Sequence, residues 1–250
     1  LTPGWKIYWR TPGEAGLPPE IDILADGNML ASSISWPIPT RFNAFGFDNF
    51  GYDTSVILPV EVTGHRRGSA VRLRGQIEAL VCADICVPLA GTVALTIPGG
   101  IASATVESRA IAKAVAMVPR GAASPLFTIE RAWQEESTLH IQFSKPHSID
   151  DIFIEGIEGV AFKKPHLNGT DATIAIEASM PVDLAGKRVT ATIVAGDQFA
   201  EQSFTITTTS GNTTANDPGW VIFILAWLGG LTLNVMPCVL PVLAIKLSTV

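Results

Sequence analysis

The clearest element in this sequence is a strand between Ala70 and Cys82, where apolar and polar side chains alternate. Its two faces are Val71, Leu73, Ile77, Ala79 and Val81 on one side, and Arg72, Arg74, Gln76 and Glu78 on the other. A period of two over this length predicts a β-strand with one buried face. The parity of the strand places Cys82 on the less buried face.

Weaker patterns predict that the first hundred residues are mostly β and are followed by a helix. Segments 55–63 and 92–97 are further strand candidates. The apolar side chains of residues 107–118 recur with a helical period and predict one helix. Pro119 and Gly121 predict where it ends. The apolar side of this helix consists of Ile111, Ala112, Val115 and Ala116.

A second β-rich block follows the predicted helix. Its candidate strands are 126–132, 138–143, 152–154, 173–177, 189–194 and 203–208. Short strands at this spacing, separated by glycine, proline, asparagine and aspartate turns, predict a β-sandwich. A polar linker then leads into the last part of the chain.

The C-terminal part is apolar and carries no charged residue between Asp217 and Lys246. A helix needs about 20 apolar residues to cross a bilayer, and this run is long enough. Pro237 and Pro241 would break its helical hydrogen bonding, so we interpret it as the first helix of a truncated polytopic membrane domain. The N-terminus lacks the pattern of a signal peptide, and we expect a mature or trimmed sequence.

Composition argues against nucleic acid as a partner. The net charge is −6, 16% of the residues are charged, and the densest basic stretch, residues 65–74, is short. A solvated strand end accounts for such a stretch, so we expect no binding to DNA or RNA.

The three cysteines are distributed unusually: Cys82 and Cys86 are close together, and Cys238 lies in the apolar run. If residues 83–85 are the loop of a hairpin, the facing Cα atoms lie about 4.5–5.5 Å apart, which allows a disulfide. Such a small ring removes little chain entropy, and a hairpin tip is accessible, which favours thiol exchange over a purely stabilising role. Asp84 would disfavour a thiolate beside it, or is simply a turn residue.

Two other interpretations of the pair stay open. One is a structural disulfide that staples a β-sandwich. The other is a copper(I)-binding module that uses both thiolates. Zinc fits less well because no second cysteine pair or histidine pair accompanies the first, and we expect no metal or cofactor.

Residues 42–52 contain five aromatic side chains and two glycines. One interpretation is an irregular loop whose rings fill the core. The other is a mobile flap in which Phe42, Phe45 or Phe47 covers the cysteine pair. Cys238 lies between two prolines, and a redox thiol or an inert one would both fit there.

Residues 234–246, with the sequence Asn-Val-Met-Pro-Cys-Val-Leu-Pro-Val-Leu-Ala-Ile-Lys, resemble the opening of the transmembrane domain of DsbD-family thiol:disulfide interchange proteins. Residues 82–88 resemble the signature of the family's N-terminal periplasmic domain, which has an immunoglobulin-like fold. Residues 57–60 match the strand before it. The overall layout is similar to the ScsB branch, which is linked to copper tolerance. The loop between Cys82 and Cys86 is shorter than in the archetypal DsbD pair.

The resemblance implies an electron relay across the bacterial inner membrane. Cys86 matches the cysteine that attacks a partner disulfide, Cys82 the resolving cysteine, and Cys238 the first of two membrane cysteines. The implied partners are a periplasmic thioredoxin-fold oxidoreductase of the ScsC or DsbC type and the protein's own transmembrane and C-terminal thioredoxin-like domains, which this chain lacks. The implied enzyme is a membrane protein-disulfide reductase whose soluble part faces the periplasm.

Together these observations predict a mainly β protein with two immunoglobulin-like β-sandwich domains followed by a transmembrane helix. We expect a redox-active domain at residues 1–118 and a second sandwich at 119–210. A linker at 211–218 and the membrane helix at 219–250 complete the expected organisation.

Overall fold

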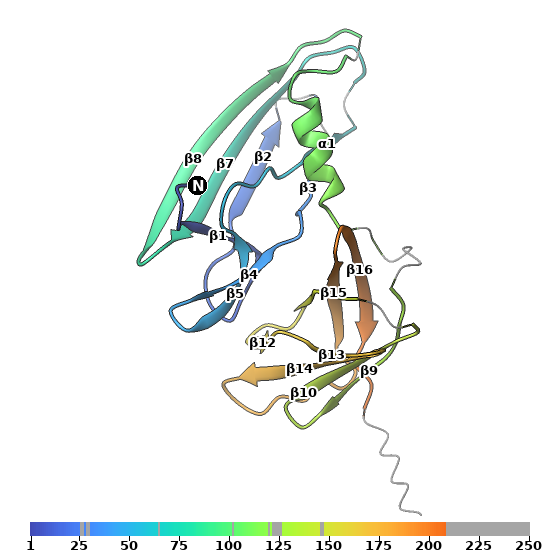
Figure 1. Cartoon of the computed structure of the whole chain (residues 1–250). Helices are drawn as coiled ribbons and strands as arrows, with labels where there is room; N and C mark the ends of the chain where they lie inside the picture. The colour runs from blue at the N-terminus through green and yellow to red at the C-terminus, as the bar shows by residue number, and fades with distance from the viewer. Residues whose placement is uncertain are drawn as a thin grey trace, which may run out of the picture. The chain divides into compact units, whose positions relative to one another are not determined.

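The computed structural model describes residues 1–25, 28, 31–64, 66–101, 103–119, 121, 127–145 and 148–208 (Figure 1). The expected mainly β fold is confirmed, with one helix among the described residues. No helix in this part is long and apolar enough to cross a membrane. The predicted linker, the predicted membrane helix and Cys238 lie outside the described residues.

The first block of strands, up to residue 119, is built on a six-stranded sheet. The order of its strands is β2-β7-β1-β5-β4, with β8 paired to β7. Their bounds are β1 (Lys6–Gly13), β2 (Glu20–Ala25), β4 (Thr40–Ala44), β5 (Phe47–Tyr52), β7 (Val71–Cys82) and β8 (Cys86–Ile97). A separate pair is formed by β3 (Ala31–Ile34) and β6 (Val60–Thr63).

The longest hairpin joins β7 and β8, and it is the long green hairpin in Figure 1. The predicted strand 70–82 is confirmed as β7, because its alternating side chains fit a sheet with one buried face. Strand β8 starts six residues before the predicted segment 92–97. By contrast, the predicted strand 55–63 shortens to β6, which begins at Val60.

The aromatic stretch is a β-hairpin, and the expectation of an irregular loop was wrong. Strands β4 and β5 pair antiparallel, and the turn between them consists of Phe45 and Gly46, with φ of 56° and 87°. Positive φ at both central residues matches the right-handed twist of the flanking strands, which is why such turns close tight hairpins. Phe50 and Tyr52 are buried, whereas Phe45 and Phe47 are exposed.

Helix α1 (Ser108–Ala116) is close to the predicted segment 107–118. The backbone N–H of Thr105 donates to Oγ of Ser108 at 2.8 Å, which fixes the chain at the start of the helix. Among its residues the buried side chain is Ala114, while Ile111 and Val115 are 46% and 52% exposed. The apolar side that the sequence predicts therefore stays largely in contact with solvent.

The second block, residues 127–208, forms two sheets around one core. One sheet has the order β12-β14-β10-β9 with β13 paired to β14, and the other has the order β11-β15-β16. The bounds are β9 (Ile129–Glu135), β10 (Thr138–Phe143), β11 (Asp151–Glu155), β12 (Val160–Phe162), β13 (His166–Asn168), β14 (Asp171–Ala178), β15 (Arg188–Ala195) and β16 (Gln198–Thr205). Side chains from both sheets, such as Ile141, Ile174 and Ile193, are fully buried in a shared core, as in a sandwich.

Residues 1–208 form one compact unit, and the contacts between the two blocks explain why. Phe153 of β11 is buried in an aromatic cluster with Trp9, Phe50 and Tyr52 of the first block. Its ring centroid lies 5.0 Å from that of Phe50 in an edge-to-face arrangement, which is favourable for aromatic pairs.

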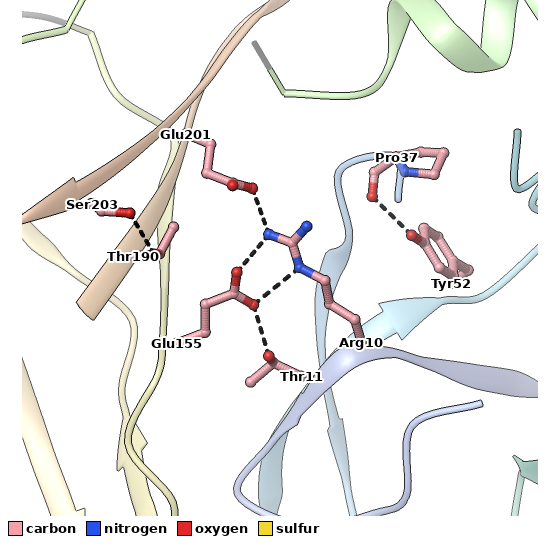
Figure 2. Close-up of polar contacts among 8 residues, drawn as sticks. All are labelled: Arg10, Thr11, Pro37, Tyr52, Glu155, Thr190, Glu201 and Ser203. Carbon is pink, nitrogen blue, oxygen red and sulfur yellow. Dashed lines mark hydrogen bonds and ion pairs between the residues drawn. The ribbon is translucent and has the colours of Figure 1, made fainter. Parts of the chain in front are cut away.

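Charged side chains surround this aromatic contact. Figure 2 shows Arg10 of β1 bound to Glu155 of β11 and Glu201 of β16, with N–O distances of 2.5 Å to each carboxylate. Thr11 donates to the same Glu155 carboxylate at 2.7 Å. Burial lowers the pKa of Arg10, but the hydrogen bonds and charges of the two glutamates outweigh it and raise the pKa above its ordinary value.

A second arginine, Arg41 of β4, makes a two-pronged ion pair with Asp151, both N–O distances being 3.0 Å. Its guanidinium also lies 4.7 Å from the ring centroid of Phe50. On another side of the contact Lys163 forms an ion pair with Glu14. The first block is thus held to the second through β1, β4 and β5.

Candidate redox site

Cys82 and Cys86 form a disulfide across the end of the β7–β8 hairpin, with an S–S distance of 2.07 Å. The two residues are direct cross-strand partners, and their Cα atoms lie 4.1 Å apart. The ladder from Val71↔Ile97 to Cys82↔Cys86 continues to the last pair before the loop. The hairpin therefore positions both sulfur atoms through backbone pairing.

The two cysteines differ sharply in exposure. Cys82 is 2% exposed, whereas Cys86 is exposed to solvent. The parity of the strand correctly places Cys82 on the same face as Arg72 to Glu78. The prediction that Cys82 is less buried on that face was wrong. Arg72 to Glu78 on that face are exposed, but at Cys82 strand β1 pairs with β7 and brings Tyr8 over the sulfur.

The hydroxyl of Tyr8 contacts the buried sulfur of Cys82. Its O–H donates to Sγ of Cys82 at 3.5 Å, and the tyrosine itself is 3% exposed. Burial raises the pKa of Tyr8 above its ordinary value, so the hydroxyl keeps its proton at physiological pH. The O–H can therefore donate to a thiolate on Cys82 as well as to the disulfide.

Gly16 explains how Tyr8 becomes buried. A Cβ at this position would lie 2.4 Å from Cζ of Tyr8, and the φ of Gly16 is +114°, which side chains rarely adopt. The loop after β1 therefore packs directly against the tyrosine ring. The sequence prediction missed Tyr8, because Ile7, Tyr8 and Trp9 form a continuous apolar run in which no polar face marks a strand.

Phe42 is the member of the aromatic stretch that comes nearest to this site. Its ring centroid lies 6.0 Å from that of Tyr8, and Nζ of Lys6 lies 5.5 Å from the Phe42 ring centroid. The strand register places Lys6, Tyr8 and Phe42 on the same face of the sheet as Cys82, because cross-strand partners share a face. One face of the sheet thus holds the disulfide, and the other holds the aromatic cluster with Phe153.

The other predicted vicinity residues are exposed. Phe47 shares the face of Phe42 by register and is 46% exposed, while Phe45 sits in the turn and is 60% exposed. Asp84 is an exposed loop residue between the cysteines. Within that loop the N–H of Ala83 donates to the carbonyl of Ile85 at 2.9 Å. A role for these residues stays a prediction.

The chemistry that this geometry supports directly is thiol–disulfide exchange. A pair of neighbouring thiols can cycle between disulfide and dithiol, and an exposed sulfur on one of them can exchange with an external disulfide. Separately, the described part of the chain contains no group of three or more histidine, cysteine, aspartate or glutamate side chains arranged to hold a metal ion.

Comparisons with known proteins agree with this geometry. Residues 1–98 match the family model of the N-terminal domain of the thiol:disulfide interchange protein DsbD. Residues 117–209 match a domain of unknown function. Comparison with curated proteins finds no match.

One solved structure is similar over most of the chain: the N-terminal periplasmic domain of ScsB from Proteus mirabilis. The TM-score is 0.67 and the sequence identity 24%, over 83% of this chain and 84% of the other. At this identity the likeness establishes the fold.

The first block is therefore similar to the N-terminal domain of DsbD and has its immunoglobulin-like fold. These two findings agree with the resemblance to DsbD- and ScsB-like thiol:disulfide interchange proteins that the motifs indicate. A disulfide-bonded cysteine pair in such a domain supports thiol:disulfide interchange as its general activity.

Proposed function

We propose that the chain is the periplasm-facing part of a membrane protein-disulfide reductase and that Cys86 is the cysteine that attacks the partner's disulfide. The observation that carries this proposal is the unequal exposure of the pair. Cys86 is exposed at the hairpin end, whereas Cys82 is 2% exposed beneath Tyr8. A protein partner can reach the first sulfur but not the second.

The reaction begins with the pair in its dithiol state. The thiolate of Cys86 attacks one sulfur of the partner's disulfide, a new S–S bond forms, and the partner's other sulfur leaves as a thiolate. The thiolate of Cys82 then attacks Sγ of Cys86. This step forms the Cys82–Cys86 disulfide and releases the partner's second thiolate, so two electrons pass to the partner.

Tyr8 assists the second step in this proposal. Its hydroxyl lies 3.5 Å from Sγ of Cys82 and keeps its proton, so it donates a hydrogen bond to the resolving thiolate. Phe42 packs beside Tyr8 on the same face.

The partners proposed are a periplasmic thioredoxin-fold oxidoreductase, which receives the electrons, and membrane thiols, which supply them. Cys238 is the proposed membrane thiol in this chain, and the residues around it match the family motif. The similar Proteus mirabilis structure is that of a periplasmic domain of ScsB, and this supports a periplasmic location for the soluble part.

Trapping tests the assignment. In a Cys238→Ser background, Cys82→Ser should accumulate a mixed disulfide with a periplasmic thioredoxin-fold protein, because the attacking thiol remains and the resolving thiol is gone. Cys86→Ser is the matched control, and we expect it to trap little because Cys82 is buried. The adduct is measured by non-reducing electrophoresis and mass spectrometry. If neither variant traps a partner, the proposal is wrong.

Two simple measurements separate the other interpretations of the pair. A structural staple predicts a reduction potential below about −300 mV and resistance to glutathione. A copper module predicts stoichiometric copper(I) that is lost in either cysteine variant. Exchange at a potential within the range of periplasmic oxidoreductases would favour the relay over both.

A further inference from the structure

Strand β8 is an unusual edge strand. It pairs with β7 and with no other strand in the described part of the chain, and all twelve of its residues are exposed. Between Asp84 and Glu107 the sequence contains no charged residue. Long, uncharged edge strands invite pairing with another chain, and proteins normally protect them with charges or a covering segment.

One face of this strand, opposite to the face that carries the Cys86 side chain, is apolar. Its half-exposed side chains are Val87 (40%), Leu89 (52%), Val93 (56%), Leu95 (58%) and Ile97 (46%). The apolar face continues inward, because a Cβ on Gly75 of β7 would meet Val93 at 2.7 Å and Ile23 of β2 at 3.4 Å. A contiguous exposed apolar surface of this kind is typical of interaction sites.

The backbone of β8 also offers hydrogen-bonding groups along its free edge. The Cα distance of 4.1 Å between Cys82 and Cys86 is that of a pair without mutual hydrogen bonds, whose N–H and C=O groups point away from the partner strand. Because backbone orientation alternates along a strand, Pro88 points to the free edge in the same way as Cys86. A proline has no N–H, so at this position it removes no hydrogen bond to β7. The outward-pointing amides that follow belong to Ala90, Thr92, Ala94 and Thr96.

The position of Cys86 identifies what pairs with this edge. The attacking cysteine is the first residue of β8, so a partner whose sulfur reaches Cys86 already has its chain at the start of the edge. An uncharged, apolar strand accepts an extended segment that is itself uncharged, because a buried charge would lack a counterion here. Added strands bind through main-chain hydrogen bonds and alternate side chains.

We propose that β8 is the docking edge on which a disulfide-bearing partner protein places an extended, uncharged segment while its disulfide exchanges at Cys86. This inference rests on the proposed function and names the surface that the partner uses. Pro88 prevents pairing directly beside the attacking sulfur, and the pairing begins at Ala90.

The test compares a protein disulfide with a small one. The reduced full chain, in a Cys238→Ser background, is reacted with oxidised DsbC and separately with 5,5′-dithiobis(2-nitrobenzoic acid). Ala94→Pro removes an outward amide, which an edge strand tolerates, and Ala94→Ser is its control. We expect Ala94→Pro to slow exchange with DsbC about fivefold, the worth of one backbone hydrogen bond, and to leave the small-molecule rate unchanged.

A second variant tests the apolar face. Leu95→Lys should slow exchange with DsbC about tenfold, because the contact of a leucine side chain is lost. Leu24→Lys is the matched control, since Leu24 is 58% exposed on β2, the other edge of this part of the sheet. We expect Leu24→Lys to behave like the wild type with both disulfides.

Hydrogen exchange on the adduct formed by the Cys82→Ser variant gives a direct view. The amides of Ala90, Thr92, Ala94 and Thr96 should exchange more slowly in the adduct with DsbC than in the free chain. The inference is overturned if these amides stay unprotected, or if Ala94→Pro and Leu95→Lys both leave the DsbC rate unchanged. It is also overturned if a variant slows both disulfides equally, or if β8 instead joins two copies of this chain.

The wild-type chain distinguishes failure of the docking edge from failure of the proposed function. If it exchanges with neither disulfide, the proposed function itself fails. If it exchanges normally with both, and the β8 variants do the same, the docking edge alone is wrong.

Discussion

The two blocks of this protein bury their apolar side chains in different ways. The second block closes two sheets around a core in which Leu139, Ile152 and Leu184 are fully buried. The first block has a small aromatic cluster, and one of its four buried members, Phe153, comes from the second block. Its β7–β8 hairpin keeps most of its apolar side chains partly exposed.

The difference shows how the first block compensates for the apolar surface that its hairpin leaves exposed. Burial of apolar surface is the main source of folding stability. A sheet whose apolar side chains stay partly exposed therefore gains less stability from them. Here the second block supplies a buried ring and the carboxylates of Asp151, Glu155 and Glu201 to the face opposite the disulfide. The redox face is then free for a partner.

The largest expected effect comes from removing the shared ring. Phe153→Ala should lower the free energy of unfolding by about 3–5 kcal/mol, because a large buried ring leaves a cavity. Urea unfolding followed by tryptophan fluorescence measures it, since Trp9 lies in the same cluster. Phe45→Ala, at an exposed turn, should change stability by less than about 0.5 kcal/mol. A loss below about 1 kcal/mol for Phe153→Ala would contradict the shared core.

The next effect should come from the ion pairs, and their burial sets the order. Arg41→Ala should cost about 3 kcal/mol, because the side chains of Arg41 and Asp151 are 10% and 14% exposed and the carboxylate would lose its partner. Arg10→Ala should cost less, about 1–2 kcal/mol, because Arg10 itself is 27% exposed, Glu201 is 32% exposed, and Glu155, at 14%, keeps its hydrogen bond from Thr11. A double-mutant cycle of Arg41 with Asp151 checks the coupling, and equal losses for both arginines would argue against this order.

A smaller effect is expected on the redox face. Tyr8→Phe should slow resolution of the mixed disulfide about two- to tenfold, the worth of one hydrogen bond to the resolving sulfur. Rapid-quench alkylation of the adduct measures this rate. Tyr52→Phe is the matched control, because its hydroxyl donates to the carbonyl of Pro37 on the opposite face and should leave the rate unchanged. An unaltered rate in Tyr8→Phe would remove Tyr8 from the mechanism.

The smallest effect at physiological pH concerns the titration of Tyr52. Burial raises the pKa of Tyr52 above its ordinary value of 10.0, although the charge of Arg10 opposes this. The folded state thus holds the phenol proton more tightly than the unfolded state. The contribution of this proton to folding stability is complete below pH 10 and is lost as the pH rises further. Urea unfolding at about pH 9 and about pH 11 should show a smaller decline for Tyr52→Phe than for the wild type. Equal declines would contradict a buried phenol.

Local patterns were sufficient for many strands but not for the first block as a whole. The alternation in β7 and the spacing of β10, predicted as residues 138–143, depend on side chains of the strand itself. Strand β1 was missed because Ile7, Tyr8 and Trp9 place apolar side chains on both faces of the sheet. No polar face therefore marks the strand in the sequence. Strands β4 and β5 were missed because a Phe-Gly turn is an uncommon hairpin signal.

The candidate site shows a similar division. The hairpin spacing of Cys82 and Cys86 indicated the disulfide, which depends on two residues close in sequence. The burial of Cys82 depends on Tyr8, 74 residues away, and on Gly16, which lets the loop approach. The exposure of Cys86 likewise follows from its place on a free edge. Sequence spacing contains neither kind of information.

The cross-strand pairing of the two cysteines also determines how long a covalent adduct survives. Because the β7–β8 ladder holds Cys82 opposite Cys86 in advance, the second thiol acts at a high effective concentration on any mixed disulfide at the first. The adduct should therefore be short-lived, and a partner that binds poorly should be released quickly as the ring closes. A contact that lasts only briefly lets one domain serve many partner molecules in turn.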